Sequence, residues 1–193
     1  MAEIKQTERV ERVMKSAFFY CNKYRHEFVM PEHLLLALTE NTNFNAALNP
    51  YCSIPSFANK IENYLEGMEM VPIEIDYKPE LSIQMDMVIA SAINNVELSE
   101  AESIDIPHLV KGLQELKDSW AAYMLKECLG DKEQYFISDL IDYCEYDDMM
   151  FDENDDNEAK SQKKSWKLLV TCMNDNYLRQ NPLIGRDNEL KRT

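Results

Sequence analysis

Histidines beside carboxylates are the side chains in this sequence best suited to acid–base chemistry. The sequence holds three histidines, His26, His33 and His108, and His26 is followed directly by Glu27. A histidine paired with a carboxylate could act as the base of a hydrolase, so a hydrolase using His26 or His33 stays open as one alternative. A single His–Glu pair is a weak signal for a metal ion, and we predict no metal site.

The common catalytic motifs do not occur in the sequence. It has no G-x-x-x-x-G-K-[ST] loop, no G-x-G-x-x-G, no H-E-x-x-H and no G-x-S-x-G. Binding of ATP requires a glycine-rich loop whose backbone N–H groups hold the phosphates, so we expect this chain to bind no cofactor. We therefore predict that the chain by itself is not an enzyme.

Five cysteines are spread widely along the chain, at Cys21, Cys52, Cys128, Cys144 and Cys172. Their number is odd and no two of them form a C-x-x-C pair. Disulfide frameworks and zinc sites usually show even counts or tight spacing. The pattern therefore predicts free thiols in a reducing cytoplasm.

The composition is that of an acidic helical protein. The 193 residues include 35 Asp and Glu against 20 Lys and Arg, a net charge of −15, and only 4 are glycine. This charge argues against nucleic acid, whose phosphates need a basic surface, and against an anionic membrane surface. No apolar run reaches the roughly 20 residues of a membrane span.

An internal repeat is the most informative feature of the sequence. An apolar face with helical spacing recurs 75 positions later: Val10, Val13, Met14, Ala17, Phe18 and Cys21 are matched by Met85, Val88, Ile89, Ala92, Ile93 and Val96. The same register aligns His33 with His108 without a gap. Because the two histidines occupy equivalent positions, we interpret them as capping or packing residues. Each copy has an apolar face too large to leave in water, and two copies can cover each other.

The repeat predicts an all-α fold of two tandem four-helix repeats with pseudo-twofold symmetry, followed by an acidic linker. We assign the double-repeat domain to residues 1–145, with the first repeat at about 7–67 and the second at about 81–145. Between the repeats, apolar and polar residues alternate from Val71 to Lys78, which predicts an extended connector with one face packed down.

The composition changes near the end of the second repeat. Nine acidic residues and no basic residue lie between Asp142 and Glu158, and such a run resists burial. We predict a mobile acidic linker at 146–164. The run lacks the glycine and the spacing of a calcium-binding loop. Residues 165–193 turn basic and contain Asn181-Pro182-Leu183-Ile184-Gly185-Arg186.

Two motifs resemble those of Clp proteins. Arg25-His26-Glu27-Phe28, followed by Glu32-His33-Leu34-Leu35-Leu36-Ala37-Leu38, resembles the signature of the Clp N-terminal repeat domain. The segment at 181–186, with Glu189-Leu190, is similar to the entry to the first ATPase module of Clp proteins. The first motif, with a linker rather than a long coiled-coil insertion, looks most similar to ClpA-like AAA+ unfoldases.

This resemblance implies a recruiting function. The parent would be a homo-hexameric ATPase that uses ATP and Mg²⁺ and pairs with the ClpP protease in the cytoplasm. Its N-terminal domain would receive a ClpS-like adaptor and protein substrates, and 165–193 would begin a truncated first ATPase module. In that family Ile184, Gly185 and Arg186 would lie near the nucleotide. A stand-alone helical scaffold unrelated to proteolysis is the other alternative.

The docking site is expected at a junction between helices of the first repeat. The buried face of the first helix ends at Cys21, so Arg25, His26 and Glu27 should follow at its C-terminal end. Glu32 should lie in the first turn of the next helix. We expect His26 at the surface. The resemblance implies that acidic residues of this stretch face the adaptor, and we assign adaptor and substrate binding to Arg25, His26, Glu27 and Glu32.

Overall fold

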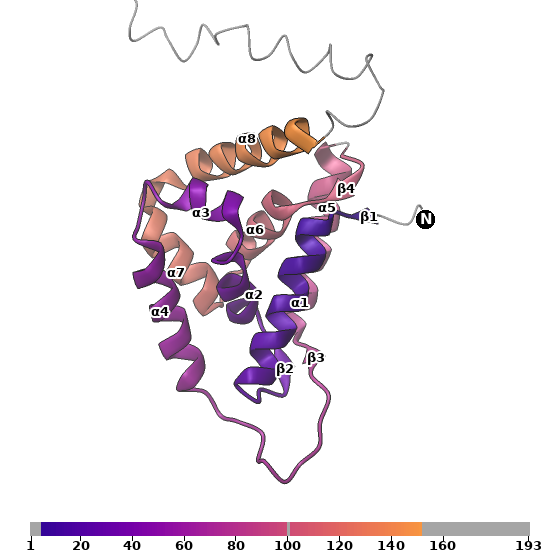
Figure 1. The fold of residues 1–193 in the computed structure, drawn as a ribbon, viewed down its shortest axis with the longest axis vertical. Coiled ribbons are helices and arrows are strands. Elements are labelled where there is room, and N and C mark those ends of the chain that lie inside the picture. Colours follow the sequence, from indigo (N-terminus) through magenta and orange to yellow (C-terminus); the bar gives the residue numbers. More distant parts are fainter. Residues whose placement is uncertain (1–4, 100, 152–193) are drawn as a thin grey trace, which may run out of the picture. The chain divides into compact units, whose positions relative to one another are not determined.

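A computed structural model describes residues 5–99 and 101–151 of the chain. The first repeat consists of β1 (Lys5–Gln6), α1 (Glu8–Lys23), β2 (Phe28–Val29), α2 (Pro31–Leu38), α3 (Thr42–Leu48) and α4 (Ile54–Glu66). The second consists of β3 (Glu80–Leu81), α5 (Ile83–Ser99), β4 (Ser103–Ile104), α6 (Ile106–Glu115), α7 (Trp120–Leu129), a 3₁₀ turn (Gly130–Lys132) and α8 (Glu133–Phe151). The predicted all-α class with two four-helix repeats is confirmed, and the strands are only two residues long (Figure 1).

Both repeats bury the same face of their first helix. Val10, Val13, Ala17 and Cys21 of α1 are buried, and so are their counterparts Met85, Val88, Ala92 and Val96 of α5. The remaining matched pairs, Met14 with Ile89 and Phe18 with Ile93, are half-buried and pack against the core. Thr7 accepts a hydrogen bond from the Val10 N–H and fixes the start of α1. The matched residues, which are 75 positions apart in the sequence, are therefore buried to the same degree in the two repeats.

Two short parallel ladders obey the pseudo-twofold symmetry. In one, Lys5 pairs with Ser103 and Gln6 with Ile104. In the other, Phe28 pairs with Glu80 and Val29 with Leu81. The two ladders are equivalent, because each residue of the first ladder lies 75 positions from a residue of the second, and the pairing is the same in both. Each repeat thus contributes one strand to each ladder, and the ladders join the repeats at opposite ends of the domain (Figure 1).

A single hydrophobic core extends through both repeats. Phe44 of α3 and Phe136 of α8 are fully buried, and their rings meet edge to face at 5.6 Å between centroids. Such aromatic pairs stabilise a core beyond the area they bury. Arg9 of α1 forms a two-pronged ion pair with Asp105, the residue before α6, at 2.6 Å for the shorter contact. The repeats therefore share apolar and polar contacts and form one unit.

Helices α5 and α6 cross very closely at Gly112. A Cβ atom added at Gly112 would lie 2.7 Å from the carbonyl oxygen of Val88. The equivalent position in the first repeat is Ala37, which is buried in α2. The two helix pairs are therefore related in topology but differ in how closely their backbones approach.

The connector differs from its prediction. Ile73 is 85% exposed and Ile75 is 52% exposed, so the alternating apolar residues do not form a packed face. The chain turns here, because the Ile75 N–H donates to the Pro72 carbonyl at 3.1 Å. The turn breaks the period of two that a straight extended segment needs, and this explains why the prediction of one packed face is wrong.

The start of the acidic segment also differs from its prediction. Helix α8 continues to Phe151, so residues 146–151, which were expected in the linker, are helical. Phe136, Leu140 and Cys144 anchor the helix at four-residue spacing, and extending an anchored helix costs little. The compact unit that contains both repeats ends within this helix, at Tyr146. Residues 152–164 and 165–193 lie outside the described residues.

The cysteines do not all match the prediction of free thiols. Cys52 and Cys128 form a disulfide between the repeats, with Cα atoms 6.0 Å apart. Their separation of 76 residues leaves no local sequence signal, which is why spacing alone missed them. Cys21 and Cys144 are buried, and Cys172 lies outside the described residues. No helix in the described part of the chain is long and apolar enough to cross a membrane.

Candidate interaction surface

Arg25 holds the connector to the end of α1. Its backbone has φ +55°, a conformation that residues other than glycine rarely adopt. Its guanidinium donates to three connector carbonyls, at 2.9 Å to Val71, 2.7 Å to Pro72 and 3.0 Å to Ile75. The Val71 N–H donates back to the Arg25 carbonyl at 2.7 Å. Arg25 is therefore a positioning residue whose Nε and Nη2 donors are engaged within the domain.

His26 lies inside the domain, and the prediction that it is a surface residue is wrong. His26 is 3% exposed and His33 is fully buried, with His26 Nδ1 2.8 Å from His33 Nε2. The Met30 N–H donates to His33 Nδ1 at 3.0 Å, so the proton of neutral His33 is on Nε2 and is donated to His26. Burial lowers the pKa of both histidines, that of His33 to about 3 with a further decrease from the neighbouring His26. Two neutral rings that face each other do not fit the histidine–carboxylate hydrolase.

The equivalent histidines of the two repeats have the same capping role. His108 Nδ1 accepts a hydrogen bond from the Asp105 N–H at 3.0 Å, as His33 Nδ1 does from Met30. Each histidine thereby satisfies a backbone donor at the start of its helix, where no intrahelical partner exists. The interpretation of His33 and His108 as capping residues is confirmed.

The buried His33 is expected to make the domain sensitive to acid. Because the pKa of His33 falls from about 6.5 in the unfolded chain to about 3 in the folded one, the unfolded chain binds the extra proton first. The contribution of neutral His33 is complete above pH 6.5 and is lost as the pH falls toward 3. Lowering the pH from 7 to 5 should cost about 2 kcal/mol of unfolding free energy through His33 alone. Urea unfolding at both pH values measures this.

A His33→Gln variant provides the control for this prediction. It loses the titrating group, so its stability should be lower at pH 7 but should change by about 2 kcal/mol less between pH 7 and 5. Identical pH dependence in the variant and the wild type would show that His33 does not titrate as its burial requires.

Glu32 also lies inside the domain, where it caps a helix of the other repeat. It is 4% exposed, and Oε1 accepts from the Ala121 N–H at 3.1 Å and from the Ser119 hydroxyl at 3.3 Å. A carboxylate is well placed there, because the first N–H groups of α7 lack helical partners and the helix dipole favours negative charge. Glu32 does lie in the first turn of α2, as predicted, but its carboxylate is turned away from solvent.

Glu27 is the one residue of the predicted four that lies exposed. Exposed apolar side chains occur on the neighbouring Phe28 and on the connector that Arg25 holds. Phe28 beside it is 41% exposed. The Glu80 N–H donates to the Glu27 carbonyl at 3.2 Å, and Arg25 brings the connector to the same place. We call Glu27, Phe28, Ile73 and Ile75 the junction surface. Sequence reasoning missed its apolar half, although the alternation of Ile73 and Ile75 with acidic residues was a visible signal.

An aromatic cluster occupies the interface between α4 and α7. Tyr64 and Trp120 have ring centroids 5.3 Å apart, and Trp120 meets Tyr123 edge to face at 5.4 Å. Trp120 is 49% exposed and Tyr123 is 55% exposed. Burial raises the pKa of Tyr64, and the nearby Glu32 raises it further. These rings form a second exposed apolar surface, distant in sequence from the junction surface.

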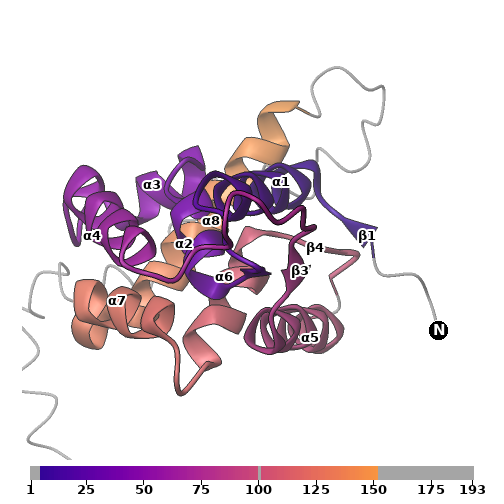
Figure 2. The ribbon, with the colours of Figure 1, turned by 90° about the horizontal axis from the view of Figure 1, so that it is seen from below.

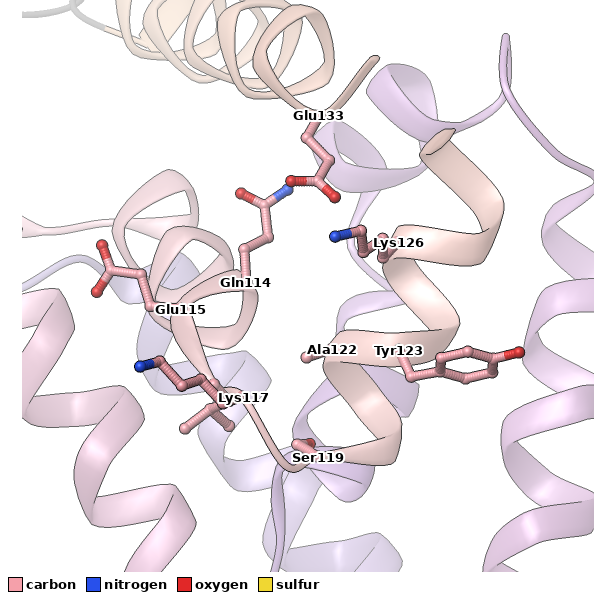
Figure 3. A pocket seen from close by; sticks show the side chains of 9 residues that line it. Gln114, Glu115, Lys117, Ser119, Ala122, Tyr123, Lys126 and Glu133 are labelled. Carbon is pink, nitrogen blue, oxygen red and sulfur yellow. The ribbon is translucent and has the colours of Figure 1, made fainter. Parts of the chain in front are cut away.

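A hollow of about 350 Å³ lies between the end of α6, the start of α8 and α7 (Figure 3). Its lining carries mixed charges, with Lys117 and Lys126 near Glu115 and Glu133. Gln114 and Glu133 point toward each other across its upper edge (Figure 3). Among the described residues, no group of three or more His, Cys, Asp or Glu side chains is arranged to hold a metal ion. Ile184, Gly185 and Arg186 lie outside the described residues.

Comparison with known proteins identifies the repeats. Residues 5–128 match the family model described as Clp repeat (R) N-terminal domain. The fold is similar to the Hsp104 N-terminal domain of Candida albicans, with 16% identity, a TM-score of 0.59, and coverage of 71% of this chain and 89% of that chain. The fold is also similar to the N-terminal domain of ClpD, a caseinolytic protease associated chaperone of Arabidopsis thaliana. Here the identity is 19%, the TM-score is 0.56, and the match covers 72% of this chain and 97% of that chain.

A further match comes from a structure named for a peptide of the EAEC T6SS Sci1 SciI protein. It has 19% identity, a TM-score of 0.57, and coverage of 72% of this chain and 89% of that chain. At these identities the structural matches show the fold, whereas the family model covers most of the chain, including the first repeat and the second as far as residue 128. The chain therefore belongs to the Clp repeat (R) N-terminal domain family.

Proposed function

We propose that this chain recruits an adaptor and protein substrates for an ATP-dependent Clp-type unfoldase. The observation that supports this most is the junction surface, where Glu27 and Phe28 are exposed and the connector held by Arg25 exposes two isoleucines. Exposed apolar side chains cost solvation free energy and are typical of protein-binding sites. The family membership favours this function over a scaffold unrelated to proteolysis.

The junction surface is built on a fixed support. Arg25 ties three connector carbonyls to the end of α1, and the ladder of β2 with β3 lies directly next to it. Pre-ordered groups lose less conformational entropy on binding, so an exposed apolar turn held in this way favours tight association. The net charge of −15 and the acidic connector residues Glu74 and Asp76 select a partner with basic and apolar groups.

The remaining parts of this proposal concern the parent protein. A ClpS-like adaptor and unfolded protein segments are the proposed partners, in the cytoplasm. Assembly into a homo-hexamer, contact with ClpP, and use of ATP and Mg²⁺ would belong to ATPase modules. The sequence has no phosphate-binding loop, so no nucleotide step is assigned to the residues of this chain.

Charge reversal and truncation at the junction surface are expected to weaken adaptor binding at least tenfold. The combined variant Glu27→Lys, Ile73→Ser, Ile75→Ser removes the acidic group and both apolar contacts while leaving the buried residues intact. Losing a central apolar contact or a charge pair typically costs 1–3 kcal/mol, and about 1.4 kcal/mol corresponds to tenfold. Calorimetric titration with a purified ClpS-like adaptor measures the change in Kd.

Leu98→Ser is the matched control for this experiment. Leu98 is 81% exposed and lies at the end of α5 opposite β3 and the connector (Figure 1). Its replacement should change Kd by less than about twofold. Unchanged affinity of the combined variant, with circular dichroism showing an intact fold, would contradict docking at the junction surface.

A further inference from the structure

The disulfide between Cys52 and Cys128 joins two elements that are distant in sequence. Cys52 lies two residues before α4 of the first repeat, and Cys128 lies in the last turn of α7 of the second. Both cysteines are half-buried, so the bond lies near the surface rather than in the sealed core. A crosslink of this kind can be reached by small thiols and disulfides.

Noncovalent contacts along the same interface support the two helices without the crosslink. Lys60 of α4 forms an ion pair with Glu127 of α7, and Tyr64 packs on Trp120. The start of α7 is held separately by the carboxylate of Glu32. Figures 1 and 2 both show α4 and α7 side by side along their length. Breaking the disulfide therefore releases only the C-terminal end of α7, and the domain should remain folded.

The other described cysteines are poor candidates for the same chemistry. Cys21 is fully buried, and burial raises the pKa of its thiol to about 11, so little reactive thiolate forms. Its Sγ also donates to the His26 carbonyl at 3.1 Å. Cys144 is 3% exposed. The structure thus separates two buried thiols, Cys21 and Cys144, from one half-buried pair that forms a disulfide.

We propose that Cys52 and Cys128 form a reversible redox site that covalently locks the two repeats together. The oxidant is a low-molecular-weight disulfide of the glutathione class. One cysteine thiolate attacks the small disulfide and releases one small thiol, leaving a mixed disulfide on the protein. The second cysteine then attacks the protein-bound sulfur and releases the second small thiol. Two electrons pass to the small disulfide, and the two protons of the cysteine thiols go to the released thiols.

The lock controls the mobility of the α4–α7 interface, where the aromatic cluster is exposed. In the oxidised state the ends of α7 are fixed by Glu32 and by Cys128. In the reduced state the segment around Cys128 and the segment before α4 can separate. We expect reduction to lower Tm by about 10 °C, because a disulfide that closes a long loop restricts the unfolded chain most. Amide exchange should increase mainly in the last turns of α7.

The test uses the full chain in a Cys172→Ser background, which removes the one cysteine outside the described residues. The reduced protein is incubated with mixtures of reduced and oxidised glutathione, then examined by intact mass spectrometry and thermal unfolding. We expect a loss of about 2 Da, with a rise in Tm that a thiol reductant reverses. Persistent glutathione adducts at both cysteines, or equal Tm values in the two states, would overturn the proposal.

The double variant Cys52→Ala, Cys128→Ala separates the lock from a general effect of reductant. It should fold, its Tm should be close to that of the reduced wild-type protein, and its Tm should not change with redox conditions. A double variant that still responds to reductant would place the redox site elsewhere. A double variant that does not fold would contradict the claim that the noncovalent contacts of α4 and α7 suffice. None of these outcomes depends on adaptor binding at the junction surface, so this test is independent of the proposed function.

Discussion

Replacing Gly112 by valine is expected to lower the free energy of unfolding by about 3 kcal/mol or more. The Cβ alone would lie 2.7 Å from the Val88 carbonyl oxygen, and that oxygen belongs to the backbone of α5, which cannot rotate away. The two γ-methyl groups of valine add further overlap. Helices α5 and α6 would have to separate, and the apolar face shared by Val88 and Leu113 would lose contacts. Urea unfolding followed by circular dichroism measures the loss.

Two further variants show whether the cause is the close helix crossing. Gly112→Ala adds only the Cβ and should cost about 1–2 kcal/mol despite the better helix propensity of alanine. Gly67→Ala is the matched control, because a Cβ there meets no atom closer than 3.5 Å and the backbone is right-handed. Its stability should stay equal or rise slightly. A Gly112→Val variant as stable as the wild type would rule out the close approach of α5 and α6.

Replacing Glu32 by lysine should destabilise the domain by about 3 kcal/mol or more, although a docking role alone would predict a change in binding only. The substitution removes an acceptor from the Ala121 N–H and the Ser119 hydroxyl, and leaves a buried positive charge at the positive end of α7. An uncompensated buried charge is among the most destabilising changes a single residue can make. Chemical denaturation of the purified variant gives the loss directly.

Conservative and exposed substitutions separate capping from docking. Glu32→Gln keeps one oxygen acceptor and should cost only about 1 kcal/mol, mainly the lost interaction with the helix dipole. Glu27→Lys, five residues earlier and exposed, should change stability by less than about 0.5 kcal/mol. Equal stability of Glu32→Lys and Glu27→Lys would contradict the capping role. This difference also means that an affinity loss in Glu32→Lys cannot identify a binding surface.

The sequence predicted the fold well because the fold depends on local periodicity. Val10 to Cys21 and Met85 to Val96 carry the helical period themselves. In each repeat four of the six positions are buried and the other two are half-buried against the core. The capping role of His33 and His108 could also be predicted, since each accepts a hydrogen bond from the backbone N–H of the residue three positions earlier, just before its helix begins. These features involve neighbours within one or two turns, so no knowledge of tertiary contacts was needed.

The site was predicted less well because it depends on contacts between distant residues. The position of Glu32 in the first turn of α2 followed from the sequence, but its burial depends on Ser119 and Ala121, which are 87 and 89 residues away. The disulfide of Cys52 with Cys128 likewise joins residues that are far apart in sequence, 76 positions from each other. Arg25 was expected to face a partner, but three carbonyls of the connector engage its guanidinium. No local pattern encodes such pairings.

Hydrogen–deuterium exchange of the chain with and without a saturating ClpS-like adaptor tests the central claim most directly. If the junction surface receives the adaptor, slower exchange should be confined to residues 25–29 and 69–78, the end of α1 with β2 and the connector. The aromatic cluster of Tyr64, Trp120 and Tyr123 should exchange as in the free chain. Protection centred on α4 and α7, with the connector unchanged, would contradict the account, and so would the absence of any protection.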